Sequence, residues 1–126
     1  MILADTSIWV NHLRHGDHVL VRLLEDAQIL GHPWVLGEIS LGRLANRRQA
    51  LGLIANLAQA VVASHDETMM LIERHELWGR GIGLVDAQLL SATLLTADAQ
   101  LWTRDKRLAA AAEQLGCAAE ARGTAN

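Results

Sequence analysis

The sequence predicts a three-layer α/β/α domain with a mainly parallel central sheet. Short apolar runs, such as residues 1–4, 28–31 and 101–103, alternate with longer segments in which apolar residues recur every three or four positions. The short runs are typical of strands buried on both faces, and the longer segments of amphipathic helices. Strands that alternate with helices favour a parallel sheet covered on both sides. The 126 residues are expected to form one domain, with 120–126 as a flexible tail.

The first half of the chain begins with a strand that stops at an acid. This acid is Asp5, and Thr6 or Ser7 is expected to cap the following helix. Asp17 is expected to cap a second helix, and Pro33 suits the first position of a third. In order, we expect a strand over residues 1–4, helices over 8–13 and from Asp17 to about 27, a strand over 28–31, helices over 33–41 and 47–58, and a strand over 60–63.

The second half centres on a helix that is apolar almost all round. Residues 84–95 carry only four polar side chains, so this helix is expected to lie deep in the domain. The glycine-rich turn before it, over 79–83, lacks the spacing of a nucleotide-binding fingerprint. The other expected elements are a helix from about Asp66 to Trp78, a strand over 101–103, a helix over 107–115 and an edge strand over 117–119.

The composition indicates an aliphatic core. Apolar residues make up 51% of the chain, with four Trp and no Tyr or Phe. Trp9, Trp34 and Trp102 are expected to be buried, Trp78 to be exposed or on a dimer face, and the single Cys117 to be a core residue. No apolar run approaches the ~18 residues of a membrane span, and no secretory leader opens the sequence, so we expect a cytoplasmic protein without membrane contact.

The charge balance leaves the partner undecided. Eleven basic residues against 14 acids give a net charge of −3, which argues against a static basic surface that coats nucleic acid. If four of the acids hold metal, ten remain against the 11 basic residues, which is close to balance. All the basic residues except Lys106 are arginine, which suits planar contact with phosphate or carboxylate.

Four acids, which we call the acidic quartet, fall at the ends of the expected elements: Asp5, Glu38, Asp86 and Asp105. Asp5 and Asp105 each follow a strand, so both are expected at the carboxyl edge of the sheet, where ligands bind in open α/β folds. Asp86 begins the most buried helix, and Glu38 lies on a helix with a core-facing side. Each acid alone could be ordinary, and Asp5 could be only a helix cap. Together they suggest a shared pocket.

Such a pocket requires a cation. Two carboxylates about 4 Å apart repel by roughly 4 kcal/mol at an effective dielectric of about 20. Oxygen ligands favour Mg²⁺ or Mn²⁺, and a bound ion of this kind lowers the pKa of a water and neutralises charge on a phosphoryl oxygen. The quartet therefore predicts a magnesium or manganese centre.

The acids lie in four stretches: ADTSIW over residues 4–9, Glu38, GLVDAQLL over 83–90 and LWTRDKRL over 101–108. In order and spacing these stretches resemble the PIN-domain ribonucleases, and most closely the VapC toxins of bacterial toxin–antitoxin pairs. The resemblance covers nearly the whole chain. It implies a PIN-like fold, a Mg²⁺ or Mn²⁺ centre, RNA as substrate, a homodimer and inhibition by a cognate VapB-type antitoxin.

Carried over by position, the resemblance implies that the acidic quartet is both catalytic and metal-binding. Asp5 and Asp86 would be the direct ligands, while Glu38 and Asp105 would bind directly or through water and orient the attacking water. Such hydrolysis needs no 2′-OH and should leave a 5′-phosphate and a 3′-hydroxyl. The supporting hydroxyls would be those of Thr6, Ser7 and Thr103.

Several cations are candidates for contact with RNA. Arg104, Lys106 and Arg107 follow the last acid of the quartet, and their alternative role is to decorate an exposed helix start. A second set could contact either RNA or the antitoxin, and the sequence does not choose between them: Arg14, Arg43, Arg47 and Arg48.

Other polar residues are expected to be structural. His12, His15 and His18 have a spacing that zinc ligands could share, but Gly16 should break the helix between them. Asp98 precedes the last motif strand and is expected in a turn at the opposite edge of the sheet. The remaining expectations are a solvated face for Glu25 and Asp26 and helix-end or surface positions for His32, His65 and His75.

Two other classes of function stay open. A phosphoaspartate phosphatase needs a second acid two residues after Asp5, and that position is Ser7. A receiver domain needs an acidic pair near the first strand and an aspartate on a central strand, and neither is evident. A non-catalytic interaction module, in which the acids only cap helices, is the remaining alternative.

Overall fold

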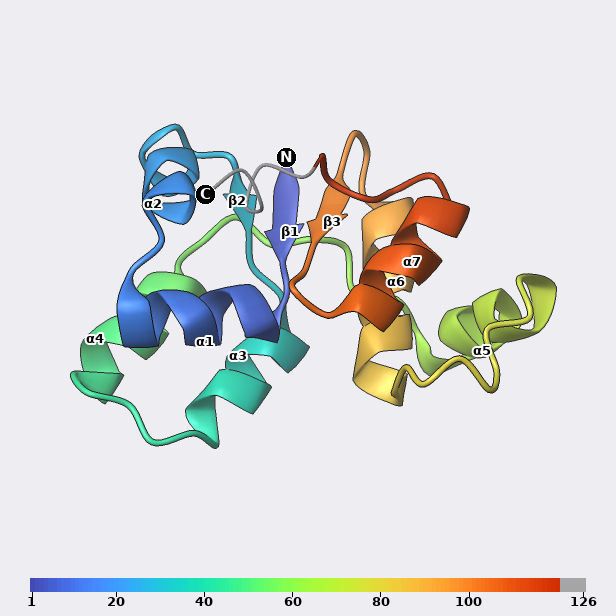
Figure 1. The fold of residues 1–126 in the computed structure, drawn as a ribbon, viewed down its shortest axis with the longest axis horizontal. Coiled ribbons are helices and arrows are strands. Elements are labelled where there is room, and N and C mark those ends of the chain that lie inside the picture. The colour runs from blue at the N-terminus through green and yellow to red at the C-terminus, as the bar shows by residue number, and fades with distance from the viewer. Residues whose placement is uncertain (121–126) are drawn as a thin grey trace.

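The computed structural model describes residues 1–120, which form a parallel sheet between two groups of helices. Figure 1 shows α1 to α4 on one side of the sheet and α5 to α7 on the other, which confirms the predicted α/β/α class. The strands are β1 (Ile2–Ala4), β2 (Ile29–Leu30) and β3 (Gln100–Trp102); the helices are α1 (Thr6–His15), α2 (His18–Glu25), α3 (Pro33–Ser40), α4 (Arg47–Ala55), α5 (His65–Arg74), α6 (Leu84–Leu95) and α7 (Lys106–Gln114).

The sheet has the order β2-β1-β3, so the first strand of the chain lies at its centre. Leu3 pairs with Leu30 on one side and with Leu101 on the other, and both pairings are parallel. Every residue of β1 is buried, which explains why its sequence is a continuous apolar run. Because the strands are parallel, their carboxyl ends meet at one edge of the sheet.

The core joins the sheet to both helical layers. Trp9 of α1, Val35 of α3 and Leu108 of α7 are all at most 1% exposed. Helix α6 matches its predicted bounds, and every residue of its central part, 87–93, is buried. Only its ends reach the surface, where Leu84 and Leu95 are exposed.

The expected strand over 60–63 is wrong. The segment makes one parallel bridge to the sheet, between Gly31 and Gln59, and then turns away. The Ala60 N–H still donates to the Gly31 carbonyl (3.0 Å), but the following N–H, that of Val61, donates to the side chain of Thr96 (2.8 Å) and not to a strand. Val61 and its neighbour Val62 are therefore exposed, so an apolar pair here did not mean a buried strand.

The expected edge strand over 117–119 is reduced to a bridge between Leu101 and Ala118. The Leu101 N–H donates to the Cys117 carbonyl (2.7 Å), and the Ala119 N–H donates back to the Leu101 carbonyl (2.9 Å). Cys117 is buried, as predicted. The predicted tail falls, apart from Glu120, outside the described residues.

Several predicted boundaries and one predicted core residue differ from the structure. Helix α4 ends at Ala55, and α5 ends at Arg74 because Glu76 adopts a left-handed conformation (φ 52°). Trp34 is 50% exposed. Helix α3 buries Val35 and the residue one turn later, so the neighbouring position 34 points away from the core. Trp9 and Trp102 are buried as expected.

Within residues 1–120, none of the helices has the length and apolar character needed to cross a membrane.

Candidate active site

The carboxyl edge of the sheet brings together the two acids that follow strands. The Asp5 N–H donates to the carbonyl of Trp102, the last residue of β3 (3.0 Å), so the chain leaves β1 and β3 side by side. Thr103 and Asp105 then follow β3 directly. The Asp5 side chain is 5% exposed and lies at the centre of this edge.

Asp5 is itself the N-cap of α1, so the expectation that Thr6 or Ser7 caps this helix is wrong. An Asp5 carboxylate oxygen accepts a hydrogen bond from the Ile8 N–H (3.3 Å). The reason is that both hydroxyls are used elsewhere. Ser7 donates to Asp5 (2.6 Å), and Thr6 donates to Glu38 (2.6 Å).

The three predicted supporting hydroxyls tie the acids of the quartet to one another. Thr103 donates to the second carboxylate oxygen of Asp5 (2.6 Å) and accepts from the Asp105 N–H (3.0 Å). Thr6 links the start of α1 to Glu38 on α3. The hydroxyls therefore fix the relative positions of three of the four acids.

Asp105 and Asp86 also have local hydrogen bonds that set their orientation. Asp105 is the N-cap of α7 and accepts from the N–H groups of Arg107 (2.8 Å) and Leu108 (3.2 Å). Asp86 lies in the first turn of α6 and accepts from the Gly83 N–H (3.1 Å). Each acid is thus held at a helix N-terminus, where backbone N–H groups and the helix dipole favour a negative charge.

The pKa of Asp5 depends on its burial and on the nearby charge of Asp86. Burial raises the pKa of Asp5 above its ordinary value, and the charge of Asp86 raises it further. Hydrogen bonds from Ser7, Thr103 and the Ile8 N–H oppose this effect because they favour the carboxylate. The ionised Asp5 is therefore disfavoured unless a positive charge lies nearby.

The pKa of Asp86 is affected by the charges of other acids of the quartet. Burial raises its pKa, the Gly83 N–H lowers it, and the charges of Asp105 and Glu38 raise it again. Asp86 is thus close enough to each of the other three acids for their charges to act on one another. A divalent cation would relieve this repulsion.

The carboxylates of the quartet offer the oxygen donors that Mg²⁺ or Mn²⁺ prefers. Among residues 1–120, no group of three or more His, Cys, Asp or Glu side chains is placed to hold a metal ion by itself. Mg²⁺ usually keeps several waters and binds through one or two carboxylates. Direct contact by Asp5 and Asp86, with Glu38 and Asp105 acting through water, suits this arrangement.

The cations that follow β3 lie beside the quartet. Arg104, Lys106 and Arg107 are all exposed at the start of α7. The Arg107 side chain packs on Gly81, where an added Cβ would lie 2.5 Å from a guanidinium nitrogen. Gly81 also has φ +77°, so the glycine-rich turn before α6 leaves room for this arginine.

The other polar residues have structural positions. Helix α1 extends to His15 and ends at Gly16 (φ 76°), as expected, and His12 accepts a hydrogen bond from the Asp17 N–H (3.0 Å). Asp98 lies in a turn (φ 57°) beside the amino end of β1, as predicted. Glu25 and Asp26 are exposed, also as predicted.

His32 is a helix-end residue that is also buried, so the surface alternative is wrong for it. It is 1% exposed and caps α3, where its Nδ1 accepts a hydrogen bond from the Trp34 N–H (3.0 Å). Burial lowers its pKa, because the charged imidazolium would be desolvated. The other two residues of this prediction lie at the ends of α5, namely His65 and His75.

An α/β/α domain with acids at the carboxyl edge of its parallel sheet is consistent with the PIN-like class of folds. The chain matches no protein-family profile. It is 51% identical over 118 residues to Ribonuclease VapC32 of two strains of Mycobacterium tuberculosis, CDC 1551 / Oshkosh and H37Rv, covering 94% of this chain and 95% of each relative. The chain therefore belongs to the VapC family of ribonucleases, which confirms the predicted family and enzyme class and removes the support for a phosphoaspartate protein.

Two residues beside the acidic quartet, Trp34 and Arg14, lie where the sequence did not predict them. Trp34 was expected in the core, yet it is exposed one helical turn before Glu38. Arg14 was named as a candidate for contact with RNA or the antitoxin without a choice between them, although Thr6, Val10 and Arg14 are spaced four residues apart and so share one face of α1. This spacing was the signal that could have linked Arg14 to the acidic quartet.

Proposed function

We propose that this chain is a Mg²⁺- or Mn²⁺-dependent endoribonuclease and the toxin of a toxin–antitoxin pair. The observation that carries the proposal is the convergence of four carboxylates, from four separate elements, on one edge of the sheet. Burial and mutual repulsion raise the pKa of Asp5 and Asp86, which is the environment of a cation site. The family to which the chain belongs supplies the reaction class, hydrolysis of RNA phosphodiester bonds.

The protein side chains have distinct tasks in this reaction. A bound divalent ion would lower the pKa of a water and neutralise charge on the scissile phosphate. Asp5 and Asp86 would hold the ion, and Thr103 and Ser7 hold Asp5 in place through hydrogen bonds of 2.6 Å each. Glu38 and Asp105 would orient the water that attacks phosphorus. The products are a 5′-phosphate and a 3′-hydroxyl.

The RNA substrate is single-stranded at the cleavage point. Trp34 is 50% exposed and lies one helical turn from Glu38, so its indole is available to stack on an unpaired base. Arg104, Lys106 and Arg107 contact backbone phosphates on the other side of the quartet. Such a substrate, and a VapB-type antitoxin that inhibits the enzyme, place the protein in the cytoplasm.

The chain forms a homodimer through the face made by α5, α6 and the segments beside them. Eight of the 12 exposed large apolar side chains of residues 1–120 belong to α5, α6 and the segments beside them: Val61, Val62, Met69, Met70, Trp78, Leu84, Leu94 and Leu95. Exposed apolar patches mark association surfaces. Light scattering should give twice the mass of one chain, and Val62→Asp should give a monomer. A wild-type monomer would contradict the assignment.

The metal-dependent activity is tested by incubating the purified protein with single-stranded RNA. Cleavage should occur with Mn²⁺ or Mg²⁺, stop on addition of chelator and return when excess Mn²⁺ is added. The new ends should carry 5′-phosphates and accept no further phosphate from a kinase until they are dephosphorylated. Cleavage that persists in chelator, or that leaves a 2′,3′-cyclic phosphate, would contradict the mechanism.

A further inference from the structure

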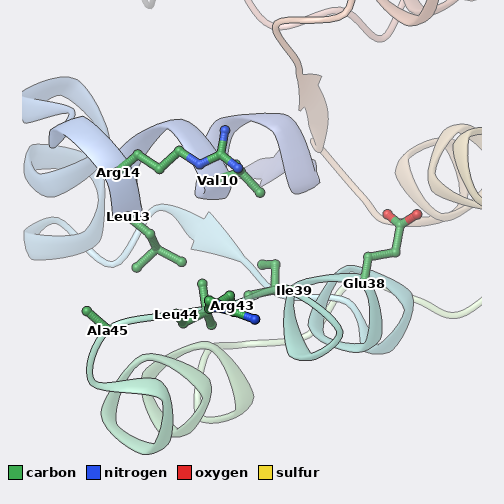
Figure 2. Close-up of a pocket in the computed structure, with 9 residues that line it drawn as sticks. Val10, Leu13, Arg14, Glu38, Ile39, Arg43, Leu44 and Ala45 are labelled. Carbon is green, nitrogen blue, oxygen red and sulfur yellow. The ribbon is translucent and has the colours of Figure 1, made fainter.

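A groove of about 110 Å³ opens beside the acidic quartet, between α1 and the segment that joins α3 to α4. Its floor is apolar and includes Leu13, Ile39 and Leu44. Its rim carries Glu38 together with two arginines, Arg14 and Arg43 (Figure 2). Because Glu38 also accepts the hydrogen bond from Thr6, one residue belongs both to the groove and to the quartet.

Helix α1 directs Arg14 toward this junction. Thr6, Val10 and Arg14 lie one turn apart on one face, and each turn rises 5.4 Å. In Figure 2 the Arg14 side chain extends along α1 as far as Val10, toward the end of the helix where Thr6 meets Glu38. Long helical side chains point toward the helix N-terminus in this way. An arginine in the last turn of a helix can cap the C-terminal carbonyls. The Arg14 guanidinium instead lies away from the C-terminus of α1.

Arg43 approaches from the opposite wall. It follows the C-terminus of α3, and no carboxylate or carbonyl within residues 1–120 accepts a hydrogen bond from either groove arginine. The neighbouring Arg47 differs, since its guanidinium donates to the Ser40 carbonyl (2.8 Å). The two groove arginines therefore keep their donors available to a ligand.

We propose that Arg14 and Arg43 bind a backbone phosphate of the RNA strand on the Glu38 side of the cleavage point. The inference rests on the proposed ribonuclease function and assigns a subsite to it. A polyanion that crosses four carboxylates needs cations along its path, and the arginines at the start of α7 supply them on one side only. The groove arginines supply them on the other, and the apolar floor receives the ribose and base edge next to the bound phosphate.

An acidic peptide with an aliphatic side chain would also match two arginines and an apolar floor. RNA is favoured because the groove is continuous with the acidic quartet through Glu38. An RNA strand held at the quartet must leave it either past Glu38 or past α7. Guanidinium groups bind phosphate through two parallel hydrogen bonds, which suits the two arginines on the rim of this groove.

The test measures binding of a short fluorescein-labelled single-stranded RNA by anisotropy, in an Asp5→Asn background that prevents cleavage. Arg14→Gln and Arg43→Gln should each weaken binding roughly tenfold and lower the slope of log Kd against log salt by about 0.7–1. Arg22→Gln, a change of the same charge at an exposed position of α2 outside the groove, should leave both quantities unchanged. Arg14→Lys should keep the salt slope because it keeps the charge.

Kinetics separate this subsite from the catalytic centre. In the active enzyme the two glutamine variants should raise KM and leave kcat at saturating RNA near that of wild type. If they bind RNA as tightly as Arg22→Gln but escape inhibition by the co-expressed antitoxin, the groove is a protein-binding site and the proposal is overturned. If wild type never cleaves RNA, the proposed function fails, while the binding result still decides the subsite.

Discussion

Asp5→Asn should abolish RNA cleavage while leaving the protein folded and more stable. Loss of an outer-shell partner of a metal ligand typically costs 10–100-fold, so loss of a direct ligand should lower kcat/KM by at least about 100-fold. Asn is as good an N-cap as Asp, so α1 should keep its start. Activity is measured by single-turnover cleavage with Mn²⁺, and folding by circular dichroism.

The gain in stability follows from the raised pKa of Asp5. Its ordinary value is 3.8, and burial moves the folded-state value upward, so wild type loses stability as the pH rises from 3.8 through the folded pKa. Asp5→Asn should therefore melt at a higher temperature than metal-free wild type at neutral pH. The difference should shrink as the pH is lowered toward 3.8, where wild-type Asp5 takes up a proton.

A matched control exists at the opposite edge of the sheet. Asp98 is exposed in a turn with φ 57°, a conformation that Asn tolerates, so Asp98→Asn changes the charge equally without touching the site. It should cleave RNA like wild type. An Asp5→Asn protein that keeps its activity would remove Asp5 from the catalytic centre.

Asp86→Asn should cause a loss of similar size, and the double variant should be scarcely worse than either single one. The reason is that residues holding one ion act as a unit, so once the first ligand is lost the second has little left to contribute. The cycle is measured with the two single variants and Asp5→Asn/Asp86→Asn in one cleavage assay. Losses that multiply would mean that the two carboxylates act independently.

Local sequence signals predicted most of the fold. The helix over 84–95 was found at its observed bounds because an almost entirely apolar segment of that length has one stable place, inside the domain. Asp17 caps α2 and Pro33 occupies the first turn of α3, both as predicted from local sequence preferences. The strand expected over 60–63 failed because its apolar pair is exposed, a fact set by where the segment leaves the sheet and not by its residues.

The positions of Asp5 and Asp105 at one edge were predictable because the edge of a parallel sheet collects the residues that follow its strands. The exact donors could not be read from the sequence. Thr103 lies 98 residues from Asp5, and only the pairing of β1 with β3 brings its hydroxyl within 2.6 Å of the carboxylate. The exposure of Trp34 was missed for a related reason, since one position of error on a helix turns a side chain from core to solvent.

Anomalous diffraction from crystals soaked in Mn²⁺ gives the most direct test of the metal centre. The account predicts a manganese peak at the carboxyl edge of the sheet, within contact distance of Asp5 and Asp86, with Glu38 and Asp105 reached directly or through water. The peak should vanish in crystals of Asp5→Asn. No peak among these four carboxylates, or a strong peak elsewhere in wild type, would contradict the account.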